Sequence, residues 1–452
     1  MKNGANSPRG RVDTAKTDPR EAAYRLLLGC EKENRYVSLA LGAFLDGSAL
    51  PQGDRAFVSA LVYGVTERKL TLDYFIKCFS GKPLSSLDRE VRMLLRLGMY
   101  QIIYLDRVPD SAAVNETVTL ASKVASRSKG FVNAVLRRTC REKAVLPYPD
   151  EKKDRLGYLS VFHSVPYEIC ALWKKDYPED FEGLISSANS QPPVTLSVNT
   201  LKTDADGLIG ILKDLGADAE KCLFSPRGVR LSGKTSIPSL APLSEGLCYV
   251  QDEASQTAGI ALGARPGDTV IDVCACPGGK SFFAAISMEN RGKVYCFDLH
   301  ESKLSLIKSE AEKLGISILD ISAHDSRSAR ADLIGKADRV ICDVPCSGLG
   351  VIAKKPEIRH KKPDADGIPL EELQYEILEN SSAYLKVGGI LVYSTCTLRR
   401  SENEGVTDRF AASHPDFAYV GISEAIPDGK LTLMPHKNLT DGFFIAKLQR
   451  IK

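Results

Sequence analysis

The sequence predicts two kinds of fold in one chain, an all-helical bundle followed by a doubly wound α/β domain. A chain of 452 residues is longer than one hydrophobic core usually serves, so two or three domains are expected. From about residue 20 to residue 143 the apolar residues recur at offsets of three and four, as one face of a helix requires. From about residue 268, short apolar strands alternate with amphipathic helices, which indicates parallel strands joined by right-handed crossovers.

Composition limits the classes of protein to which the chain can belong. A hydrophobic share of 43% with a charged share of 26% is ordinary for a globular protein, and no run approaches the roughly 18 apolar residues of a membrane span. Residues 1–18 are basic and polar without an apolar centre, so we expect a disordered tail and not a signal peptide. The twelve cysteines are scattered and form no Cys-x-x-Cys pair, which predicts a reduced, cytoplasmic protein without a metal site.

The predicted bundle covers residues 19–145, and this part of the chain is basic. Residues 1–150 hold 24 Lys and Arg against 16 Asp and Glu, whereas the rest of the chain holds 36 against 41. The end of the bundle is richest in cations: Lys123, Arg127, Lys129, Arg137, Arg138, Arg141 and Lys143, with Glu142 among them. Such a face either contacts a polyanion such as RNA or is simply solvated, and both interpretations stay open.

A proline-containing linker at residues 146–149 separates the bundle from two further parts. Residues 150–245 mix strand and helix patterns and predict a small α+β module. Residues 246–452 carry the α/β pattern. Its strands are predicted at Thr269–Val273, Lys293–Phe297, Ile318–Ser322, Arg339–Cys342 and Ile390–Ser394, with helices at Ser302–Leu314 and Leu370–Leu385.

Carboxylates stand at or near the ends of four successive predicted strands: Asp272, Asp298, Asp325 and Asp343. The carboxyl ends of parallel strands meet at one edge of the sheet, where the ligands of such domains bind. One aspartate alone would indicate a surface or capping residue. Four together indicate a pocket for a nucleoside-type cofactor, in which Asp298 is placed to accept hydrogen bonds from ribose hydroxyls.

A glycine-containing loop follows the first of these strands. The loop and the start of the next helix contain Cys274, Ala275, Cys276, Pro277, Gly278, Gly279 and Lys280. Paired glycines let the backbone pass close to a ligand, and the helix N-terminus offers unbonded amides, although an ordinary tight turn would look the same. The loop lacks the Gly-x-Gly-x-x-Gly pattern of nicotinamide enzymes, which disfavours a dehydrogenase.

Two cysteines lie just past strand ends at the same edge. Cys346 comes three residues after Asp343, and Cys396 follows the strand predicted at 390–394. Cys296 and Cys342 instead lie inside apolar strands, where a thiol packs as a small hydrophobe. A thiol in polar surroundings suits a nucleophile or an acid/base group, but it needs local help to ionise because an unperturbed thiol has a pKa of about 8.5.

With these motifs, the second half of the chain resembles the RNA cytosine-carbon-5 methyltransferase family, also called the Nop2/Sun or Fmu family. The matching stretches are 250–255, 274–280, 343–348, 393–397 and 441–444, and the pairing of Pro-Cys-Ser-Gly with Ser-Thr-Cys is specific. The first 140 residues resemble the NusB-type RNA-binding bundle, above all in 94–100, 107–109 and 130–138. The resemblance implies a NusB-like domain, a small RNA-recognition module at 150–245 and a Rossmann-like methyltransferase domain at 246–452 that uses S-adenosyl-L-methionine.

The resemblance also implies roles for the two thiols. Cys396 would attack carbon 6 of a cytosine, which makes carbon 5 nucleophilic enough to take the methyl group. Cys346 would assist the later loss of the proton on carbon 5 and the release of the base. In DNA cytosine methyltransferases the Pro-Cys cysteine is the nucleophile, so this assignment rests on the family. In either case the base must be unstacked to be reached.

For the cofactor, the resemblance implies that residues 274–280 hold the methionine part, Asp298 the ribose and Asp325 the adenine side. Asp343 would lie between the cofactor and the target base. The implied substrate is 16S ribosomal RNA, acted on by a monomer. Transfer RNA and 23S ribosomal RNA remain alternative substrates, and a non-catalytic RNA-binding or assembly factor is a further alternative.

The sequence departs from the family pattern at three places. Cys276 stands where alanine is usual, a small change that fits if the loop has slack. Ser197 stands where arginine is common, which puts one RNA or structural contact in doubt. The basic loop at 354–362 lacks an expected aromatic residue, and its charge indicates either contact with a phosphate backbone or a solvated loop.

Overall fold

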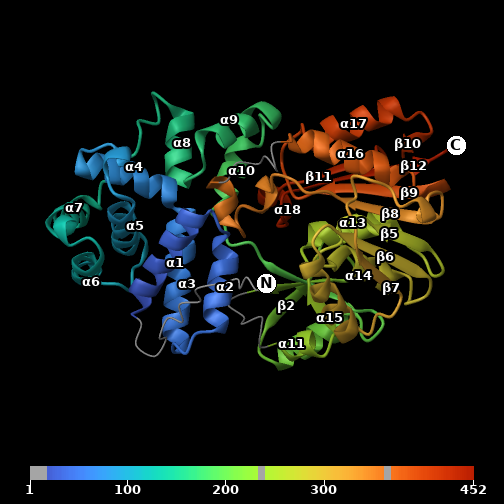
Figure 1. Cartoon of the computed structure of the whole chain (residues 1–452), viewed down its shortest axis with the longest axis horizontal. Coiled ribbons are helices and arrows are strands. Elements are labelled where there is room, and N and C mark those ends of the chain that lie inside the picture. The colour runs from blue at the N-terminus through green and yellow to red at the C-terminus, as the bar shows by residue number, and fades with distance from the viewer. Residues whose placement is uncertain (1–17, 233–239, 361–367) are drawn as a thin grey trace, which may run out of the picture. The chain divides into compact units, whose positions relative to one another are not determined.

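The computed structural model describes residues 18–232, 240–360 and 368–452, and these residues form two compact units (Figure 1). Of the described residues, 18–171 and Lys355–His360 form unit 1, and 172–232, 240–354 and 368–452 form unit 2. The tail predicted at 1–18 lies, apart from Asp18, outside the described residues. Within the described parts of the chain, no helix is both long and apolar enough to cross a membrane.

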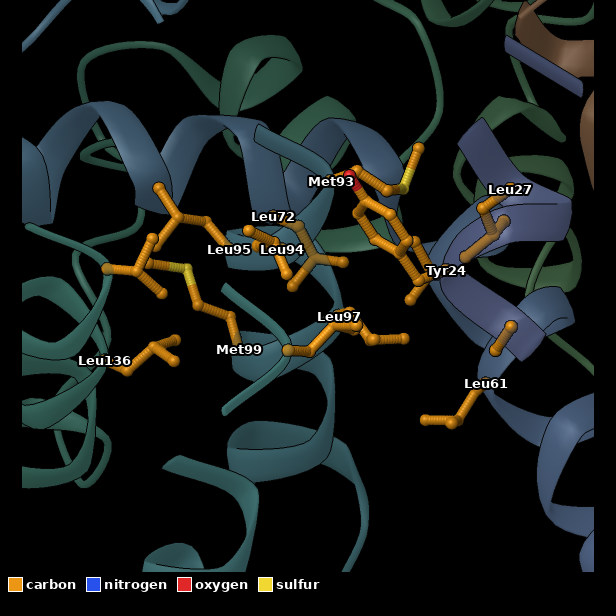
Figure 2. Packing of buried hydrophobic residues seen from close by; sticks show 14 of the residues in the cluster. Tyr24, Leu27, Leu61, Leu72, Met93, Leu94, Leu95, Leu97, Met99 and Leu136 are labelled. Carbon is orange, nitrogen blue, oxygen red and sulfur yellow. The ribbon is translucent and has the colours of Figure 1, made fainter. Parts of the chain in front are cut away.

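Unit 1 is helical, as its apolar spacing predicts. Its helices are α1 Pro19–Glu33, α2 Val37–Asp46, α3 Gln52–Glu67, α4 Lys69–Ser80, α5 Arg89–Tyr104, α6 Asp110–Val124, α7 Lys129–Glu142 and α8 Arg155–His163. Helix α5 is buried on nearly all sides, which makes it the central helix of the bundle. Figure 2 shows its leucines and methionines packed against Tyr24 of α1, Leu61 of α3 and Leu136 of α7. The unit continues past residue 145 into α8.

The segment Lys355–His360 belongs to unit 1, although it comes after the strand that precedes Cys346. Arg359 is 2% exposed, and its guanidinium donates hydrogen bonds to the carbonyls of Glu67, His163 and Ser164. These carbonyls lie at the ends of α3 and α8, where helical carbonyls lack partners within the helix. The Arg359 side chain therefore contacts neither phosphate nor solvent, whereas Lys355 is exposed and both interpretations stay open for it. Lys361 and Lys362 lie outside the described residues.

Unit 2 contains a small antiparallel sheet ordered β2-β3-β1-β4, which is packed on helix α11 Ala205–Asp214. The strands are β1 Val194–Val198, β2 Asp218–Lys221, β3 Gly228–Ser232 and β4 Cys248–Val250. Strand β4 pairs with β1, so this sheet takes its last strand from residues beyond 245. Ser197 is fully buried in β1, so a contact between RNA and the side chain at this position is excluded.

The larger sheet of unit 2 is ordered β10-β12-β9-β8-β5-β6-β7, with β11 paired to β12 (Figure 1). Its parallel strands are β5 Thr269–Asp272, β6 Lys293–Asp298, β7 Leu319–Ala323, β8 Ala337–Asp343 and β9 Leu385–Thr395. Each contains or overlaps a strand predicted from the sequence. The antiparallel strands β10 Phe417–Tyr419, β11 Lys430–Leu433 and β12 Phe443–Arg450 extend the sheet beyond β9.

Helices cover both faces of this sheet, as parallel strands require. One face packs on α13 Glu253–Leu262, α14 Gly279–Ser287 and α15 Leu304–Leu314, and the other on α16 Leu370–Ser382 and α17 Glu404–Ser413. The remaining helices are α9 Tyr167–Asp176, α10 Phe181–Ser187, α12 Ala241–Ser244 and α18 Pro435–Asn438. Cys296 and Cys342 are fully buried within strands, which confirms their packing role. No disulfide joins the twelve cysteines, all of which are described.

Candidate active site

The two cysteines that the sequence places past strand ends lie together, with their sulfur atoms 3.4 Å apart. Strands β8 and β9 are parallel neighbours in which Asp343 pairs with Ser394, so the loops that come after them start side by side. Cys346 and Cys396 are both partly exposed, unlike the thiols inside the strands. Hydrogen bonding to Cys396, followed by burial, raises the pKa of Cys346 well above its usual value. The two thiols are therefore in hydrogen-bonding contact at the carboxyl edge of the sheet, and either sulfur can be the donor.

Asp343 lies in a chain of polar contacts beside this pair. Lys280 Nζ donates to one carboxylate oxygen of Asp343 over 2.7 Å, and Ser394 Oγ donates to the other over 2.6 Å. The ammonium group of Lys280 also lies 5.2 Å from the centre of the Phe443 ring. Residues from the start of α14, from β8 and from β9 thus meet at one point, as parallel topology predicts for residues at strand ends.

The β5–α14 loop is held by backbone contacts, and its two glycines lie close to neighbouring side chains. Gly278 has a φ of 113°, and a Cβ built there would lie 2.3 Å from the Phe282 ring, so only glycine fits. Ala275 N donates to Phe297 O, and Gly278 N donates to Ala275 O. Cys274 and Gly279 are half-buried, Ala275 is buried and Pro277 is exposed.

The first two strand-end aspartates organise this loop. Asp272 is buried, accepts a hydrogen bond from Ser281 Oγ over 2.6 Å, and burial raises its pKa to about 7. Asp298 is half-buried, and its carboxylate accepts hydrogen bonds from Cys276 N and His300 N. The Cys276 side chain contacts Lys303 O over 3.8 Å, so the loop accommodates sulfur where alanine is usual. Asp298 keeps further acceptor capacity for hydroxyl donors.

Asp325 differs from the other aspartates because it already has a strong partner. Arg327 donates to both of its carboxylate oxygens at 2.6 to 3.0 Å and lowers its pKa. The chain around it reaches the same edge, because His324 N donates to Asp298 O and Ser326 Oγ donates to Val273 O. The four aspartates therefore belong to one region of the sheet.

Lys354 begins the basic loop but faces carboxylates. Its ammonium group contacts Asp252 over 2.6 Å and Asp441 over 2.9 Å, and burial raises the pKa of Asp441. Asp441 N also donates to Asp252, which caps helix α13. The positive charge of Lys354 is therefore already paired with two carboxylates. The network joins two of the motif stretches, 250–255 and 441–444.

Three buried polar residues beside the cysteines are not predicted from the sequence: Gln374, Glu402 and Asn403. They contact the loops that carry Cys346 and Cys396. Glu402 and Asn403 stand in a run of charged and polar residues after Cys396, which is typical of an exposed helix start. Their closeness to Cys396 in the sequence is the one feature of Glu402 and Asn403 that could have indicated a role at the site.

The basic surface of unit 1 is partly neutralised. Lys123 pairs with Glu21, Arg138 with Glu142 and Lys143 with Asp110. Arg137 and Arg141 instead line an open cavity of about 460 Å³ between α6 and α7, together with Ser111 and Asn115. Asp110 also lines this cavity, with its carboxylate paired to Lys143, so the guanidinium, hydroxyl and amide groups are the ones left to meet an oxygen-rich anion.

Three family descriptions match successive parts of the chain. They are the NusB family over residues 17–141, an RsmF/B-like ferredoxin-like domain over 166–238, and 16S rRNA methyltransferase RsmB/F over 259–449. Together they match the order of the bundle, the small sheet and the large sheet.

Similar proteins cover nearly the whole chain. A probable ribosomal RNA small subunit methyltransferase B of Bacillus subtilis is 35% identical over 447 residues, which is 96% of this chain and 99% of that protein. The ribosomal RNA small subunit methyltransferase B of Pseudomonas putida is 31% identical over 96% of this chain and 99% of its own length. The crystal structure of PH0851 matches with a TM-score of 0.78 at 26% identity, covering 97% of this chain and 100% of that one.

Proposed function

Because the chain belongs to the 16S rRNA methyltransferase RsmB/F family, and is an RNA methyltransferase that uses S-adenosyl-L-methionine, we propose that it methylates carbon 5 of a cytosine in 16S ribosomal RNA. The observation that carries this proposal is the distance of 3.4 Å between the sulfurs of Cys346 and Cys396. Two thiols in contact at the ligand-binding edge suit covalent chemistry on a ring, in which one attacks and the other assists release.

Cys396 is the nucleophile in this mechanism. Its thiolate forms a bond to carbon 6 of the cytosine, and the electron pair of the 5,6 double bond makes carbon 5 nucleophilic. The cofactor, when bound, supplies the methyl group that carbon 5 takes up. A base then removes the proton from carbon 5, the double bond re-forms, and the bond between Cys396 and carbon 6 breaks, which regenerates the thiolate.

Cys346 acts in the second half of this sequence. Its raised pKa keeps the thiol protonated at neutral pH, so it donates a hydrogen bond to the sulfur of Cys396. That hydrogen bond stabilises the thiolate when the bond to carbon 6 breaks, and so favours release. Asp343, which Lys280 and Ser394 hold in place, orients the base beside the methyl donor in this proposal.

The loop 274–280 and the strand-end aspartates fit the cofactor. Phe282 leaves no room for a side chain at Gly278, which is buried, and helix α14 starts at Gly279, where its first amides lack partners within the helix. Asp298 would accept hydrogen bonds from the ribose hydroxyls. Asp325 would meet the adenine side while it keeps its contact with Arg327.

We propose 16S ribosomal RNA as the substrate because of the family and the similar methyltransferases. With a ribosomal substrate, the reaction would take place in the cytoplasm. Bisulfite mapping of 16S ribosomal RNA from a strain that lacks the protein tests the proposal. One unconverted cytosine in the wild type should become convertible in the deletion strain. Loss of the mark only from transfer RNA or 23S ribosomal RNA, or no lost mark at all, would show that the proposed target is wrong.

Two cysteine variants test the mechanism. Cys396→Ala should lower methyl transfer by at least about 1,000-fold with little change in RNA binding, because no nucleophile remains. Cys346→Ala should accumulate a covalent protein–RNA adduct that survives denaturing electrophoresis. Cys78→Ala, which changes a half-buried thiol in helix α4, is the control and should behave as the wild type. Full activity of Cys396→Ala would exclude the covalent route.

A further inference from the structure

The loop that carries Cys396 is bonded to the Cys346 loop by Gly350 N, which donates to Cys396 O over 3.0 Å, and by the Ser347 and Thr397 hydroxyls, which are 2.7 Å apart. It is held in addition by one side-chain amide. Asn403 Oδ1 accepts a hydrogen bond from Thr395 Oγ1 over 2.6 Å, and Asn403 Nδ2 donates to Thr397 O over 3.0 Å. The amide therefore contacts the residue before the cysteine with its acceptor and the residue after it with its donor. A rotation of the loop about Cys396 would break one of these contacts.

The loop that carries Cys346 is held in the same manner by two other side chains. Glu402 accepts from Ser347 N over 2.8 Å, and Gln374 Nε2 donates to Pro345 O over 2.9 Å. Gln374 Nε2 also donates to Glu402 over 2.9 Å, which joins the two supports. The residues on both sides of Cys346 are thus fixed.

Both supports are anchored in the interior of unit 2. Gln374, Glu402 and Asn403 are each 0% exposed, and the carbonyl of Glu402 accepts a hydrogen bond from Tyr393 Oη over 2.6 Å. Burying a carboxylate is costly unless it is well bonded, so this arrangement needs a compensating benefit. The three side chains bond the residues that flank the two cysteines, so they act through the loops.

We propose that Glu402 and Asn403 are positioning residues that set the separation of the two catalytic sulfurs, with Gln374 completing the support. The proposal rests on the proposed function, in which Cys346 and Cys396 act on the same base. Because the two residues are adjacent in the chain, a shift of their shared backbone would disturb the supports of both cysteine loops. A misplacement of about 1 Å costs an enzyme up to about 100-fold in rate.

The separation of the sulfurs can be measured without RNA or cofactor. Diamide takes up the two hydrogen atoms that a pair of thiols loses on forming a disulfide, and mass spectrometry identifies the linked peptides. Because Glu402 also affects the pKa of Cys346, variants are compared at matched reactivity of Cys346 toward iodoacetamide, and the rate of the Cys346–Cys396 link then reports how often the two sulfurs meet. Asn403→Asp replaces the donor to Thr397 O with a repelling oxygen, and Glu402→Ala removes the acceptor of Ser347 N. Each should slow the link by about tenfold or more and lower kcat, with KM for RNA little changed.

Milder variants separate positioning from stability. Glu402→Gln keeps an acceptor for Ser347 N and should restore much of the linking rate lost in Glu402→Ala. Thr395→Val removes only the hydroxyl that donates to Asn403, and it should slow the link less than Asn403→Asp does. If Asn403→Asp fails to fold, Thr395→Val still tests this support of the loop. Asn199→Asp is the matched control, because Asn199 is equally buried and donates to two carbonyls far along the chain, Gly246 O and Leu314 O. Its linking rate should equal that of the wild type.

The outcomes distinguish this proposal from the function on which it rests. Folded Glu402→Ala and Thr395→Val proteins that link at the wild-type rate would overturn the positioning role. If Asn199→Asp slowed the link as much as these variants do, the slowing would reflect general loss of stability, and the positioning role would also be overturned. If Cys396→Ala stayed active, the covalent mechanism would fail, while the measured linking rates would still decide whether these residues position the sulfurs.

Discussion

At the scale of single residues, the two thiols of the site experience different surroundings although they touch. Cys346 has a raised pKa, first because it shares a hydrogen bond with Cys396 and then because it is desolvated, with the charge of Glu402 adding to both. In the proposed mechanism, Cys346 must stay protonated in order to stabilise the leaving thiolate of Cys396. The hydrogen bond, the desolvation and the charge of Glu402 all favour its protonated form. The buried carboxylate of Glu402 thus both supports the loop and helps to keep the thiol neutral.

This difference predicts how Cys346 reacts with iodoacetamide as pH rises. Only the thiolate is alkylated, so a raised pKa delays alkylation to pH values above the usual thiol range. Cys396→Ala removes the hydrogen bond that raises the pKa most, so the pKa of Cys346 falls and the midpoint of alkylation moves to lower pH. Mass spectrometry of the modified peptide from pH 6 to pH 11 measures this midpoint.

Cys276 provides the internal control for this experiment. Burial, followed by the charge of Asp298, raises its pKa, and neither cause involves Cys396. Its alkylation profile should be the same in the wild type and in Cys396→Ala. An unchanged midpoint for Cys346 would mean that Cys396 does not govern its ionisation.

At the scale of elements, the loop between β5 and α14 depends on one backbone conformation. Gly278→Ala forces a side chain into a left-handed conformation against the Phe282 ring, at a cost of about 1–3 kcal/mol. The loop should shift away from the ligand, and the affinity for S-adenosylhomocysteine in isothermal titration should fall by roughly tenfold or more.

Gly210→Ala is the comparison for this loop variant. Gly210 lies within helix α11, and a Cβ there meets nothing within 4 Å. Alanine is favourable in a helix, so this variant should bind S-adenosylhomocysteine like the wild type. If Gly278→Ala also bound normally, the loop could not be a tight cradle for the cofactor.

The segment Lys355–His360 is a second element whose behaviour can be predicted. Arg359→Met leaves the carbonyls of Glu67, His163 and Ser164 without their donor, and unpaired buried groups cost about 1–3 kcal/mol each. Burial lowers the pKa of Arg359 to about 10, so the group is still charged at neutral pH in the wild type. Hydrogen exchange should accelerate in the segment and at the ends of α3 and α8. Arg55→Met, at an exposed site on α3, should change exchange little.

At the scale of the whole molecule, the features that depend on periodicity are the ones that the sequence predicts. Parallel strands recur with a spacing that the residues reveal, and their ends must share an edge, so the meeting of Asp343 with Ser394 and of Cys346 with Cys396 could be anticipated. Burial of polar residues could not. Arg359 and Glu402 stand in charged stretches of the sequence that are typical of solvated segments. They are buried because segments far away in the sequence pack on them: helix ends on Arg359 and the Cys346 loop on Glu402. The short antiparallel strands β10 and β11 also lack a strong pattern of their own.

The net positive charge of unit 1 leads to a prediction for RNA binding by the whole protein. Arg137 and Arg141 line the open cavity beside α6, whereas Arg138, on the same helix, is paired with Glu142. If the first two contact phosphates, replacing both with alanine removes about two contacts, and the slope of log affinity against log salt should become shallower by about 1.5 to 2. Filter binding of a 16S ribosomal RNA fragment between 50 and 200 mM salt measures this slope.

Arg138→Ala provides the control on the same helix. Its guanidinium already bonds Glu142 and lies over the Phe79 ring, so its loss should alter the salt slope by well under one unit. The two variants carry the same kind of change at neighbouring positions, and general loss of charge would affect both. A slope that is unchanged in the double variant would make the α7 face a solvated surface and assign RNA binding to other parts of the protein.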